Sequence, residues 1–201
     1  MDQDTIAAYN AQASRYDEQT EDFWERFPVN FIDKFSKLAG NNVIDIGCGP
    51  GRDALILKKA GRDIICIDAS QTMVNICRNK GLTAVVADLL ALPFENEQFD
   101  SAWAYTSFLH LPKTEILKAL KEMKRVVKTT GVFALGMIEG DGEGYVSSEK
   151  ITLPRYFAYY QQKELEEIIK KADFRITHQV VFEPNKRRYL NYILKNPDSQ
   201  V

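Results

Sequence analysis

The chain contains 201 residues, of which 45% are hydrophobic, and its formal net charge is −2. This length and apolar content are enough for one domain with a proper hydrophobic core and hardly enough for two. The balanced charge gives no general electrostatic attraction to nucleic acid or to anionic membranes. A local basic patch is the one remaining way for the chain to attract such partners.

The sequence lacks the usual signals for export, membrane insertion and metal binding. No apolar run approaches the roughly 20 residues of a membrane span, and the acidic start of the chain is unlike a signal peptide. We therefore expect a cytoplasmic protein. Cys48, Cys66 and Cys77 are odd in number and lack C-x-x-C spacing. A disulfide framework, a zinc site or another metal site is therefore not expected.

The first part of the chain, residues 1–40, is predicted to be helical. Tyr9 and Tyr16 fall on an apolar stripe at near-helical spacing, and a second stripe covers residues 23–38. Pro28 interrupts this second stripe. We expect Pro28 to open a new helix, because proline fits a first turn but breaks a helix interior.

The most informative stretch covers residues 43–53 and has the sequence VIDIGCGPGRD. A short β-branched run is followed by a turn through Gly47, Gly49 and Gly51 and then by a segment that predicts a helix. A strand, a glycine turn and a helix form half of a βαβ unit, which brings backbone N–H groups and a helix N-terminus up to a ligand. Glycine is needed there because a Cβ atom would block both positive φ and the close approach.

The acidic residue of this turn argues against a dinucleotide ligand. In the pattern G-x-G-x-x-G a pyrophosphate lies at the helix N-terminus, whereas here the third glycine comes one residue early and Asp45 stands two residues before Gly47. A carboxylate a few ångströms from a pyrophosphate would cost on the order of several kcal/mol at an effective dielectric constant of about 20. Asp45 instead suits a ligand that presents a cation.

Asp45, Gly47, Gly49 and Gly51 complete the motif (Asp/Glu)-x-Gly-x-Gly-x-Gly, and the chain thereby resembles the class I S-adenosylmethionine-dependent methyltransferases. The resemblance covers essentially the whole chain and is strongest over residues 43–112. It implies S-adenosylmethionine as cofactor and S-adenosylhomocysteine as product, with the cofactor bound at these four residues and at Cys48. The α-ammonium and the sulfonium of this cofactor accord with a carboxylate at position 45.

Two further predicted strands, residues 63–68 and 83–87, are also associated with an aspartate at their carboxyl end. Asp68 follows the third glycine at close to the roughly 20-residue offset of an acid that binds both ribose hydroxyls. For Asp88 the resemblance implies a hydrogen bond with the adenine amino group. The alternatives are an ordinary turn residue for Asp68 and a helix N-cap for Asp88. The cofactor residues implied along this edge are Asp68, Ala69, Met73, Asp88 and Leu89, with Met73 either against the adenine or in the core.

A fourth strand is predicted over residues 99–105, and a loop over residues 106–112 follows it. The resemblance implies that the backbone near Ala104 and Tyr105 accepts from the methionine ammonium and that the loop faces the methyl group. His110 is the single side chain of this loop that would take a proton near neutral pH, which makes it a candidate general base. Because two leucines flank it, a packed structural histidine is the alternative.

The second half of the chain continues the alternation of strands and helices. Residues 139–144 are predicted as a flexible acidic loop, because no register supplies the twelfth-position glutamate of a calcium loop. The other predicted elements are a helix over 113–128, a turn at 129–131, a strand over 132–138, a helix over 163–172, and an antiparallel hairpin of 175–182 and 189–194 with Lys186, Arg187 and Arg188 at its solvated tip. His178, on this hairpin, is expected to be structural.

An aromatic segment, residues 155–160, lies between the fifth strand and the last helix. In the resembled family this region builds the acceptor pocket. Arg155, Tyr156 and Tyr159 are therefore candidate substrate contacts, with plain core packing as the alternative.

The N-terminal helices are similar to the segment that closes over the cofactor in many small-molecule methyltransferases. The resemblance rests on Tyr9, Asn10, Ala13, Tyr16 and Asp17. It implies that the two tyrosines touch the methionine end of the cofactor, with core packing as the alternative. We expect residues 1–40 to form a helical lid within the same domain as the cofactor-binding part, residues 41–201.

Together these features predict an α/β fold with a doubly wound, mostly parallel sheet. The resemblance implies seven strands with an antiparallel last strand. The leading function is methyl transfer from S-adenosylmethionine to a small-molecule acceptor by a monomer or weak homodimer, without nucleic-acid or membrane partners. A dinucleotide oxidoreductase, a cofactor-binding protein without turnover and a methyltransferase acting on a macromolecule are the alternatives.

Overall fold

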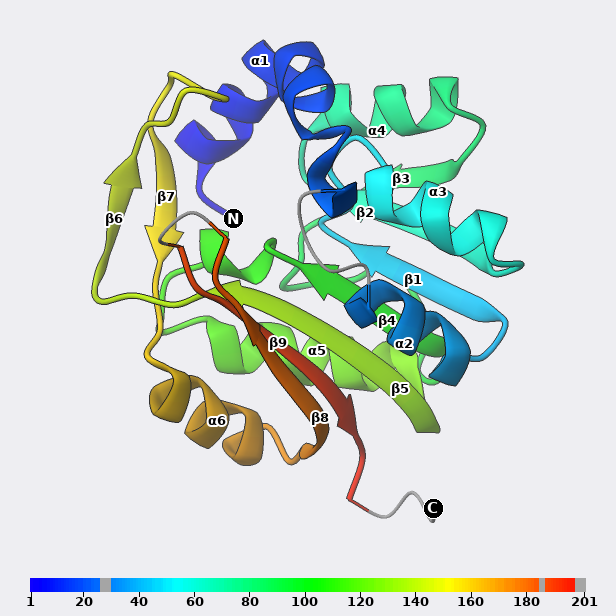
Figure 1. The fold of residues 1–201 in the computed structure, drawn as a ribbon. Helices are drawn as coiled ribbons and strands as arrows, with labels where there is room; N and C mark the ends of the chain where they lie inside the picture. The colour runs from blue at the N-terminus through cyan, green and yellow to red at the C-terminus, as the bar shows by residue number, and fades with distance from the viewer. Residues whose placement is uncertain (26–29, 185–186, 198–201) are drawn as a thin grey trace.

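A sheet of seven strands forms the centre of the protein, which is described here by a computed structural model, and helices cover both faces of the sheet (Figure 1). The structure describes residues 1–25, 30–184 and 187–197. The strand order is β3-β2-β1-β4-β5-β9-β8. The strands of this sheet are β1 (Asn42–Ile46), β2 (Asp63–Asp68), β3 (Thr83–Val86), β4 (Phe99–Tyr105), β5 (Val127–Ile138), β8 (Arg175–Phe182) and β9 (Tyr189–Lys195).

The direction of the strands confirms the predicted doubly wound sheet. Strand β1 pairs in parallel with β2 and β4, and β5 pairs in parallel with β4, whereas β9 runs antiparallel to both β5 and β8. The last two strands form the predicted antiparallel hairpin, and β9 inserts between β5 and β8. The strand order reverses between β1 and β4, and the crevice outside the carboxyl ends of these strands is where such folds bind ligands.

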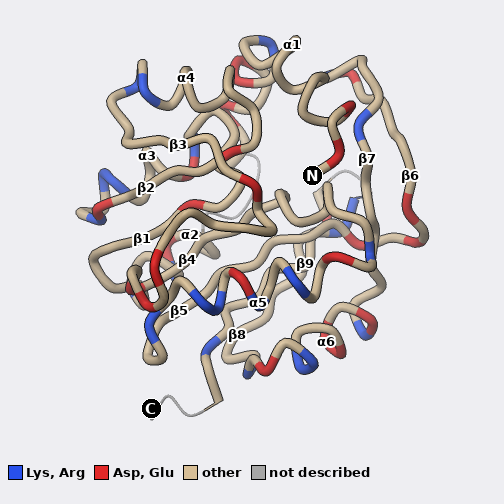
Figure 2. The backbone as a smooth tube through the Cα atoms, turned by 180° about the vertical axis from the view of Figure 1, so that it is seen from behind, with Lys and Arg blue, Asp and Glu red and all other residues tan. Residues whose placement is uncertain are grey.

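The helices alternate with the strands along the chain. Helices α5 and α6 pack together on one face of the sheet, and α2 and α3 lie on the opposite face (Figures 1 and 2). Pro28, which was expected to open a helix, lies outside the described residues. The helices are α1 (Gln3–Thr20), α2 (Asn30–Leu38), α3 (Arg52–Lys59), α4 (Gln71–Asn79), α5 (Ile116–Val126) and α6 (Gln162–Lys171), with two short 3₁₀ turns, η1 (Phe23–Glu25) and η2 (Phe108–His110).

The predicted turn at residues 129–131 is wrong, because β5 runs through it. Phe99 pairs with Val127 and Ser101 pairs with Val132, so β5 contains extra residues that bulge out of the ladder. A Cβ atom on Gly131 would lie 2.7 Å from the carbonyl oxygen of Asp100, which explains why glycine occupies this bulge.

The prediction of a flexible acidic loop over residues 139–144 is also wrong at its carboxyl end. Strand β6 (Glu143–Val146) pairs antiparallel with β7 (Arg155–Ala158) in a separate two-stranded sheet. This small sheet stands beside α1 (Figure 1). The backbone N–H of Tyr156 donates to Oγ1 of Thr5 at 2.8 Å, which joins the small sheet to the first helix.

The described surface carries mixed charge. Acidic and basic residues are interspersed along the described chain (Figure 2), and many of them pair, as in the 2.6 Å contact of Arg125 with Glu122 and that of Lys124 with Asp173. Among the described residues, none of the helices is long and apolar enough to cross a membrane.

Candidate functional site

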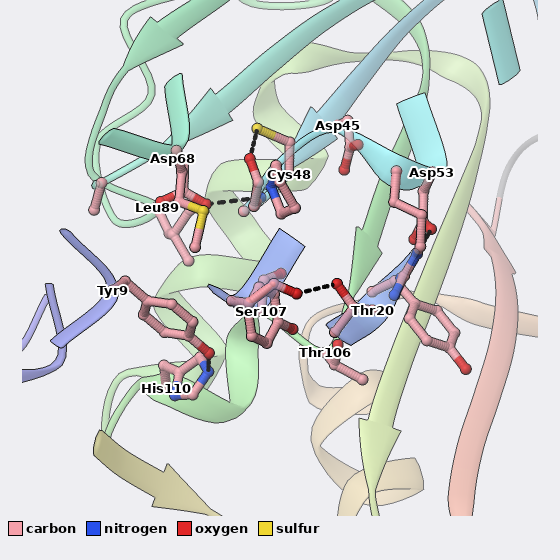
Figure 3. A pocket seen from close by; sticks show the side chains of 18 of the residues that line it. Tyr9, Thr20, Asp45, Cys48, Asp53, Asp68, Leu89, Thr106, Ser107 and His110 are labelled. Carbon is pink, nitrogen blue, oxygen red and sulfur yellow. Dashed lines mark hydrogen bonds and ion pairs between the residues drawn. The ribbon is translucent and has the colours of Figure 1, made fainter. Parts of the chain in front are cut away.

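A cavity with about 690 Å³ of empty space, part of it open to solvent, lies at the carboxyl edge of the sheet, next to the turns that follow β1, β2 and β4 (Figure 3). Helix α1 lies against the cavity and contributes two of the tyrosines that line it. The predicted cofactor residues that line the cavity are Tyr9, Tyr16, Asp45, Gly47, Cys48, Gly49, Asp68, Ala69, Met73, Leu89 and Tyr105.

The glycine turn brings its backbone up to this cavity. Gly47 and Gly49 have φ values of 74° and 53°, in the left-handed region that favours glycine. A Cβ atom on Gly47 would lie 2.2 Å from that of Ser107, whereas one on Gly49 would meet only the Tyr16 ring at 3.9 Å. The turn therefore faces open space at Gly49. Gly51, by contrast, caps α3 and does not line the cavity.

Asp45 contributes a buried acceptor without a partner. The residue is 2% exposed, and within the described part of the chain its Oδ2 atom has no hydrogen-bond partner. Burial, reinforced by the neighbouring Asp53, raises the pKa of Asp45 well above its usual value. Leaving a buried carboxyl group without a partner is costly, so a ligand with an N–H donor or a positive charge fits this position. The α-ammonium of S-adenosylmethionine is such a group.

Asp68 is held in place by the backbone. Its carboxylate accepts hydrogen bonds from the N–H groups of Gly49 and Ser70 at 2.9 and 2.8 Å. Burial raises the pKa of Asp68 to about 6, and these hydrogen bonds oppose the shift. A carboxylate has about four acceptor sites, so Asp68 keeps free acceptors toward the cavity. Two ribose hydroxyls fit this arrangement.

Sequence reasoning missed the role of Asp53. This buried carboxylate accepts from the indole N–H groups of Trp24 and Trp103 at 2.7 and 3.0 Å and from Nε of Arg52 at 2.6 Å. The Arg52 guanidinium also lies 4.1 Å from the centroid of the Phe23 ring. Asp53 thereby fixes Arg52 at the cavity wall. The two tryptophans come from distant parts of the chain, and no local pattern signals the contact.

Thr106 was also missed. It lines the cavity directly after β4 with a φ of 52°, a conformation that is strained for a β-branched residue. Its N–H donates to the carbonyl oxygen of Gly136 at 2.8 Å, which holds the strained turn in place. The turn directs the chain into the short helix that carries His110.

His110 lies in a hydrogen-bonded chain with Tyr9 and Arg155 (Figure 3 shows the first pair). Its Nδ1 atom lies 2.7 Å from the carbonyl oxygen of Tyr156, which can only accept, so Nδ1 carries the proton. Nε2 therefore accepts from the Tyr9 hydroxyl at 2.8 Å. The same hydroxyl accepts from Arg155 at 2.8 Å.

The surroundings of His110 keep its imidazole neutral. Burial lowers its pKa from 6.5 to about 4, and the nearby positive charge of Arg155 acts in the same direction. The ring packs 4.6 Å from that of Phe157. A neutral imidazole with its lone pair on Nε2 has the protonation state that a general base requires.

A second cavity, with about 1180 Å³ of empty space, adjoins the first. Arg155 and Tyr159, two of the predicted substrate contacts, line it together with His110. The residues common to both cavities are Tyr9, Tyr16, Thr20, Arg52, Thr106 and His110. The shared wall makes the pair of cavities a candidate cofactor and acceptor site.

Three predicted site residues do not line these cavities with their side chains. The carboxylate of Asp88 pairs with the N-terminal ammonium of Met1 at 3.1 Å, although its neighbour Leu89 lines the first cavity. Ala104 is buried within β4. Tyr156 contributes its carbonyl oxygen to His110, while its ring packs against Tyr145.

Comparison with known proteins finds methyltransferases that are similar to part of this chain. A model described as a methyltransferase domain matches residues 43–131. The methyltransferase GfsG from Streptomyces halstedii is 31% identical over 128 residues, which cover 59% of this chain and 42% of GfsG. The chain thus spans less than half of the length of that relative.

Solved structures share the fold over nearly the whole chain. The putative methyltransferase of Haloferax volcanii, solved with the Trm112 methyltransferase activator, matches with a TM-score of 0.78 at 18% identity and covers 98% of this chain and 99% of its own. DhpI in complex with S-adenosylhomocysteine matches with a TM-score of 0.77 at 15% identity over 96% of each chain. Residues 43–131, which hold the glycine motif, match a methyltransferase domain, and the sheet order of the chain is that of the class I S-adenosylmethionine-dependent methyltransferases, a family whose cofactor is S-adenosylmethionine.

Proposed function

We propose that the protein transfers the methyl group of S-adenosylmethionine to a small, flat or moderately apolar acceptor that carries a negative group. The observation that carries this proposal is the guanidinium of Arg155. It lines the second cavity, it is buried, and among the described residues no carboxylate pairs with it.

The contacts of Arg155 are all to neutral groups. Its side chain donates to the hydroxyls of Tyr9 and Ser148 at 2.8 and 2.9 Å, and its Nε atom has no partner in the described part of the chain. The guanidinium lies 5.1 Å from the Tyr9 ring centroid and 5.0 Å from that of Phe157. A buried cation held only by neutral partners is costly, and a carboxylate or phosphate on the acceptor would compensate it.

The rest of the second cavity supports an anionic, partly aromatic acceptor. Its lining contains three arginines, one lysine and one acid, Glu149. The walls are rich in aromatic side chains. The ones that line it are Tyr9, Tyr16, Phe23, Phe157, Tyr159 and Tyr189. Aromatic walls favour flat ligands, and the basic groups favour ligands with negative charge.

The cofactor would occupy the first cavity with its methionine end toward the second. S-adenosylmethionine, when bound, supplies a methyl group that its sulfonium has already activated. Asp45 would accept from the cofactor ammonium, Asp68 would accept from the ribose hydroxyls, and the backbone of Gly47 and Gly49 would pack closely on the ligand. Because the methyl group is activated, the protein's main task is to position and desolvate the reactants.

His110 would take the proton of an acceptor that must lose one. Its Nε2 lone pair faces the Tyr9 hydroxyl at the wall between the two cavities. An acceptor O–H or N–H that replaced this hydroxyl would donate to the same lone pair. Residues 1–40, with Tyr9 and Tyr16 on α1, would act as the lid that closes over both ligands.

A methyl-transfer assay across a metabolite panel tests this function, with S-adenosylhomocysteine release as readout. The panel contains aromatic carboxylates paired with their neutral amides. We expect the carboxylates to be methylated and the amides not to react. Arg155→Gln should raise KM for the carboxylate while leaving S-adenosylhomocysteine affinity nearly unchanged. Methylation of the amides alone would contradict an anionic acceptor. Release of S-adenosylhomocysteine without any acceptor present would contradict methyl transfer to a small molecule.

A second candidate function is methylation of a macromolecule with the help of a protein activator. The similar Haloferax volcanii protein was solved in complex with Trm112, which favours this candidate. The mixed surface charge of the present chain opposes a nucleic-acid substrate, which needs a basic stripe for its phosphates. Methylation of tRNA or protein, with the small molecules silent, would select this second candidate and leave the cofactor site intact.

A further inference from the structure

Three cysteines lie together directly behind the glycine turn. Cys48 belongs to the turn, Cys66 to β2 and Cys77 to α4. All three are buried and free, and their sulfur atoms lie within 4.8 Å of one another. Their sequence spacing gives no sign of this cluster, because the fold assembles it from three separate elements.

Cys48 and Cys77 are in direct contact, and the Cys66 thiol hydrogen-bonds with both of them. The Cys48 and Cys77 sulfur atoms are 3.7 Å apart, and both lie on the carbonyl oxygen of Gly49, at 3.4 and 3.2 Å. A disulfide bond is about 2.05 Å long, so an approach of roughly 1.7 Å would form one. Hydrogen bonds from the Cys48 and Cys66 thiols lower the pKa of Cys77, which favours the thiolate form that attacks in disulfide chemistry.

Access to this pair leads through the cofactor cavity. Cys48 is 9% exposed and lines that cavity, whereas Cys66 and Cys77 are fully buried. A small oxidant that enters this cavity therefore reaches Cys48 before the other two cysteines. A ligand in the cavity would cover the same sulfur.

We propose that Cys48 and Cys77 are a modification site at which a peroxide forms a reversible disulfide that disables the cofactor site, and that bound cofactor protects them. The neighbouring Cys77 thiolate accepts the proton of Cys48, whose own pKa is raised by its hydrogen bonds and burial. The Cys48 sulfur then attacks one oxygen of the peroxide, the O–O bond breaks, and the departing hydroxide takes that proton from Cys77, so that a sulfenic acid and one water form. The Cys77 thiolate then attacks the sulfenic sulfur, the S–S bond forms and the oxygen leaves as a second water. Two thiols thus lose two electrons and two protons, and hydrogen peroxide is reduced to two waters.

The disulfide would disturb the cofactor site because the turn has little room to move. Cys48 stands between Gly47 and Gly49, whose backbone lines the cavity. A Cβ atom on Gly51 would lie 2.5 Å from Leu82 and 3.0 Å from the sulfur of Cys77, so the turn already packs tightly on α4. Moving the Cys48 sulfur toward α4 therefore displaces the turn from its position at the cavity.

The test treats the full chain with hydrogen peroxide, with and without saturating S-adenosylhomocysteine. Free thiols are counted after denaturation, linked peptides are mapped by mass spectrometry, and S-adenosylhomocysteine affinity is measured by calorimetry before and after dithiothreitol. We expect the thiols to fall from three to one, a Cys48–Cys77 peptide, and affinity reduced by roughly tenfold or more and restored by dithiothreitol. Saturating S-adenosylhomocysteine should slow the thiol loss by a similar factor.

Single variants separate this pair from the third thiol. Cys48→Ala and Cys77→Ala should each keep both of their remaining thiols, whereas Cys66→Ala, the matched control, should still form the disulfide. The wild-type peptide map decides the question even if a variant does not fold. A disulfide that involves Cys66, or oxidation without an intramolecular disulfide, would overturn the proposal. So would a metal ion held by the three sulfurs. Unchanged cofactor affinity after oxidation would also overturn it.

Discussion

The hydroxyl of Tyr9 lies 2.8 Å from Nε2 of His110 and joins helix α1 to the short helix after β4 (Figure 3). The same oxygen accepts from Arg155 on β7 at 2.8 Å. One side chain of the proposed lid therefore contacts both the candidate base and the candidate anion-binding group. In the proposed function, closing of α1, proton uptake by His110 and acceptor binding at Arg155 are coupled through this hydroxyl.

The first prediction concerns His110 as a base. His110→Gln should lower turnover of an acceptor that must lose a proton by roughly 10²–10⁴-fold, because the lone pair that takes the proton is lost. Cofactor affinity should change little. His178→Gln on β8 is the matched control and should keep normal turnover. If His110→Gln lowered the unfolding free energy while kcat per folded molecule stayed normal, His110 would be a structural residue.

The second prediction follows from the pKa of His110, which burial lowers from 6.5 to about 4 in the folded chain. Between these values the unfolded chain binds the proton more readily, so stability falls as the pH decreases, by at most about 1.4 kcal/mol per pH unit. Asp68 acts in the opposite direction, because its folded pKa of about 6 lies above the ordinary 3.8. Urea unfolding of wild type and His110→Gln separates the two groups: the stability advantage of wild type should shrink from pH 7 to pH 4.5. A constant difference in unfolding free energy between wild type and His110→Gln over this pH range would contradict the lowered pKa of His110.

The third prediction ranks two acids at the sheet edge. Asp68→Ala should weaken S-adenosylhomocysteine binding, because charge-assisted bonds to the ribose are worth roughly 1.5–3 kcal/mol each. Asp88→Ala should cost less, since one adenine amino group is involved and the carboxylate, which does not line the cavity, pairs with the N-terminal ammonium of Met1. Calorimetry on folded variants measures both. If both variants bound S-adenosylhomocysteine as tightly as wild type does, the assignment of the two acids to the cofactor would be wrong.

The fourth prediction concerns the lid. Helix α1 is kinked at Gln12, and polar contacts hold it to α4 and to the small sheet, including Asn10 Oδ1 with Ser70 Oγ at 2.7 Å. Such a segment opens at low cost, so limited proteolysis within residues 1–20 should slow when S-adenosylhomocysteine is bound. Equal cleavage rates with and without saturating ligand would refute the lid. A chain that starts at Glu21 should fold but bind the ligand poorly.

Local sequence patterns predicted the strand, the glycine turn and the acid that surround the first cavity. The strand that ends at Ile46, the glycines after it and the acid at position 68 are neighbours in sequence or at a fixed offset, so short-range spacing was enough to place them. The antiparallel insertion of β9 came from the family resemblance, and the sheet order confirms it.

Long-range contacts account for what sequence reasoning missed. Asp53 is fixed by Trp24 and Trp103, and His110 is held by a backbone oxygen of Tyr156; each partner comes from a different element. Glu143 looked like part of an acidic loop because its pairing with Ala158 spans a long connection. None of these contacts leaves a periodic trace in the sequence.

Calorimetric titration shows whether the cofactor site around Asp45 is built for a ligand with a positive charge. The wild-type chain is titrated separately with S-adenosylmethionine, S-adenosylhomocysteine and NAD under the same conditions. We expect saturable binding of S-adenosylmethionine and S-adenosylhomocysteine and no binding of NAD, because a pyrophosphate would face the buried carboxyl group. Tighter binding of NAD than of either methionine derivative would contradict this expectation.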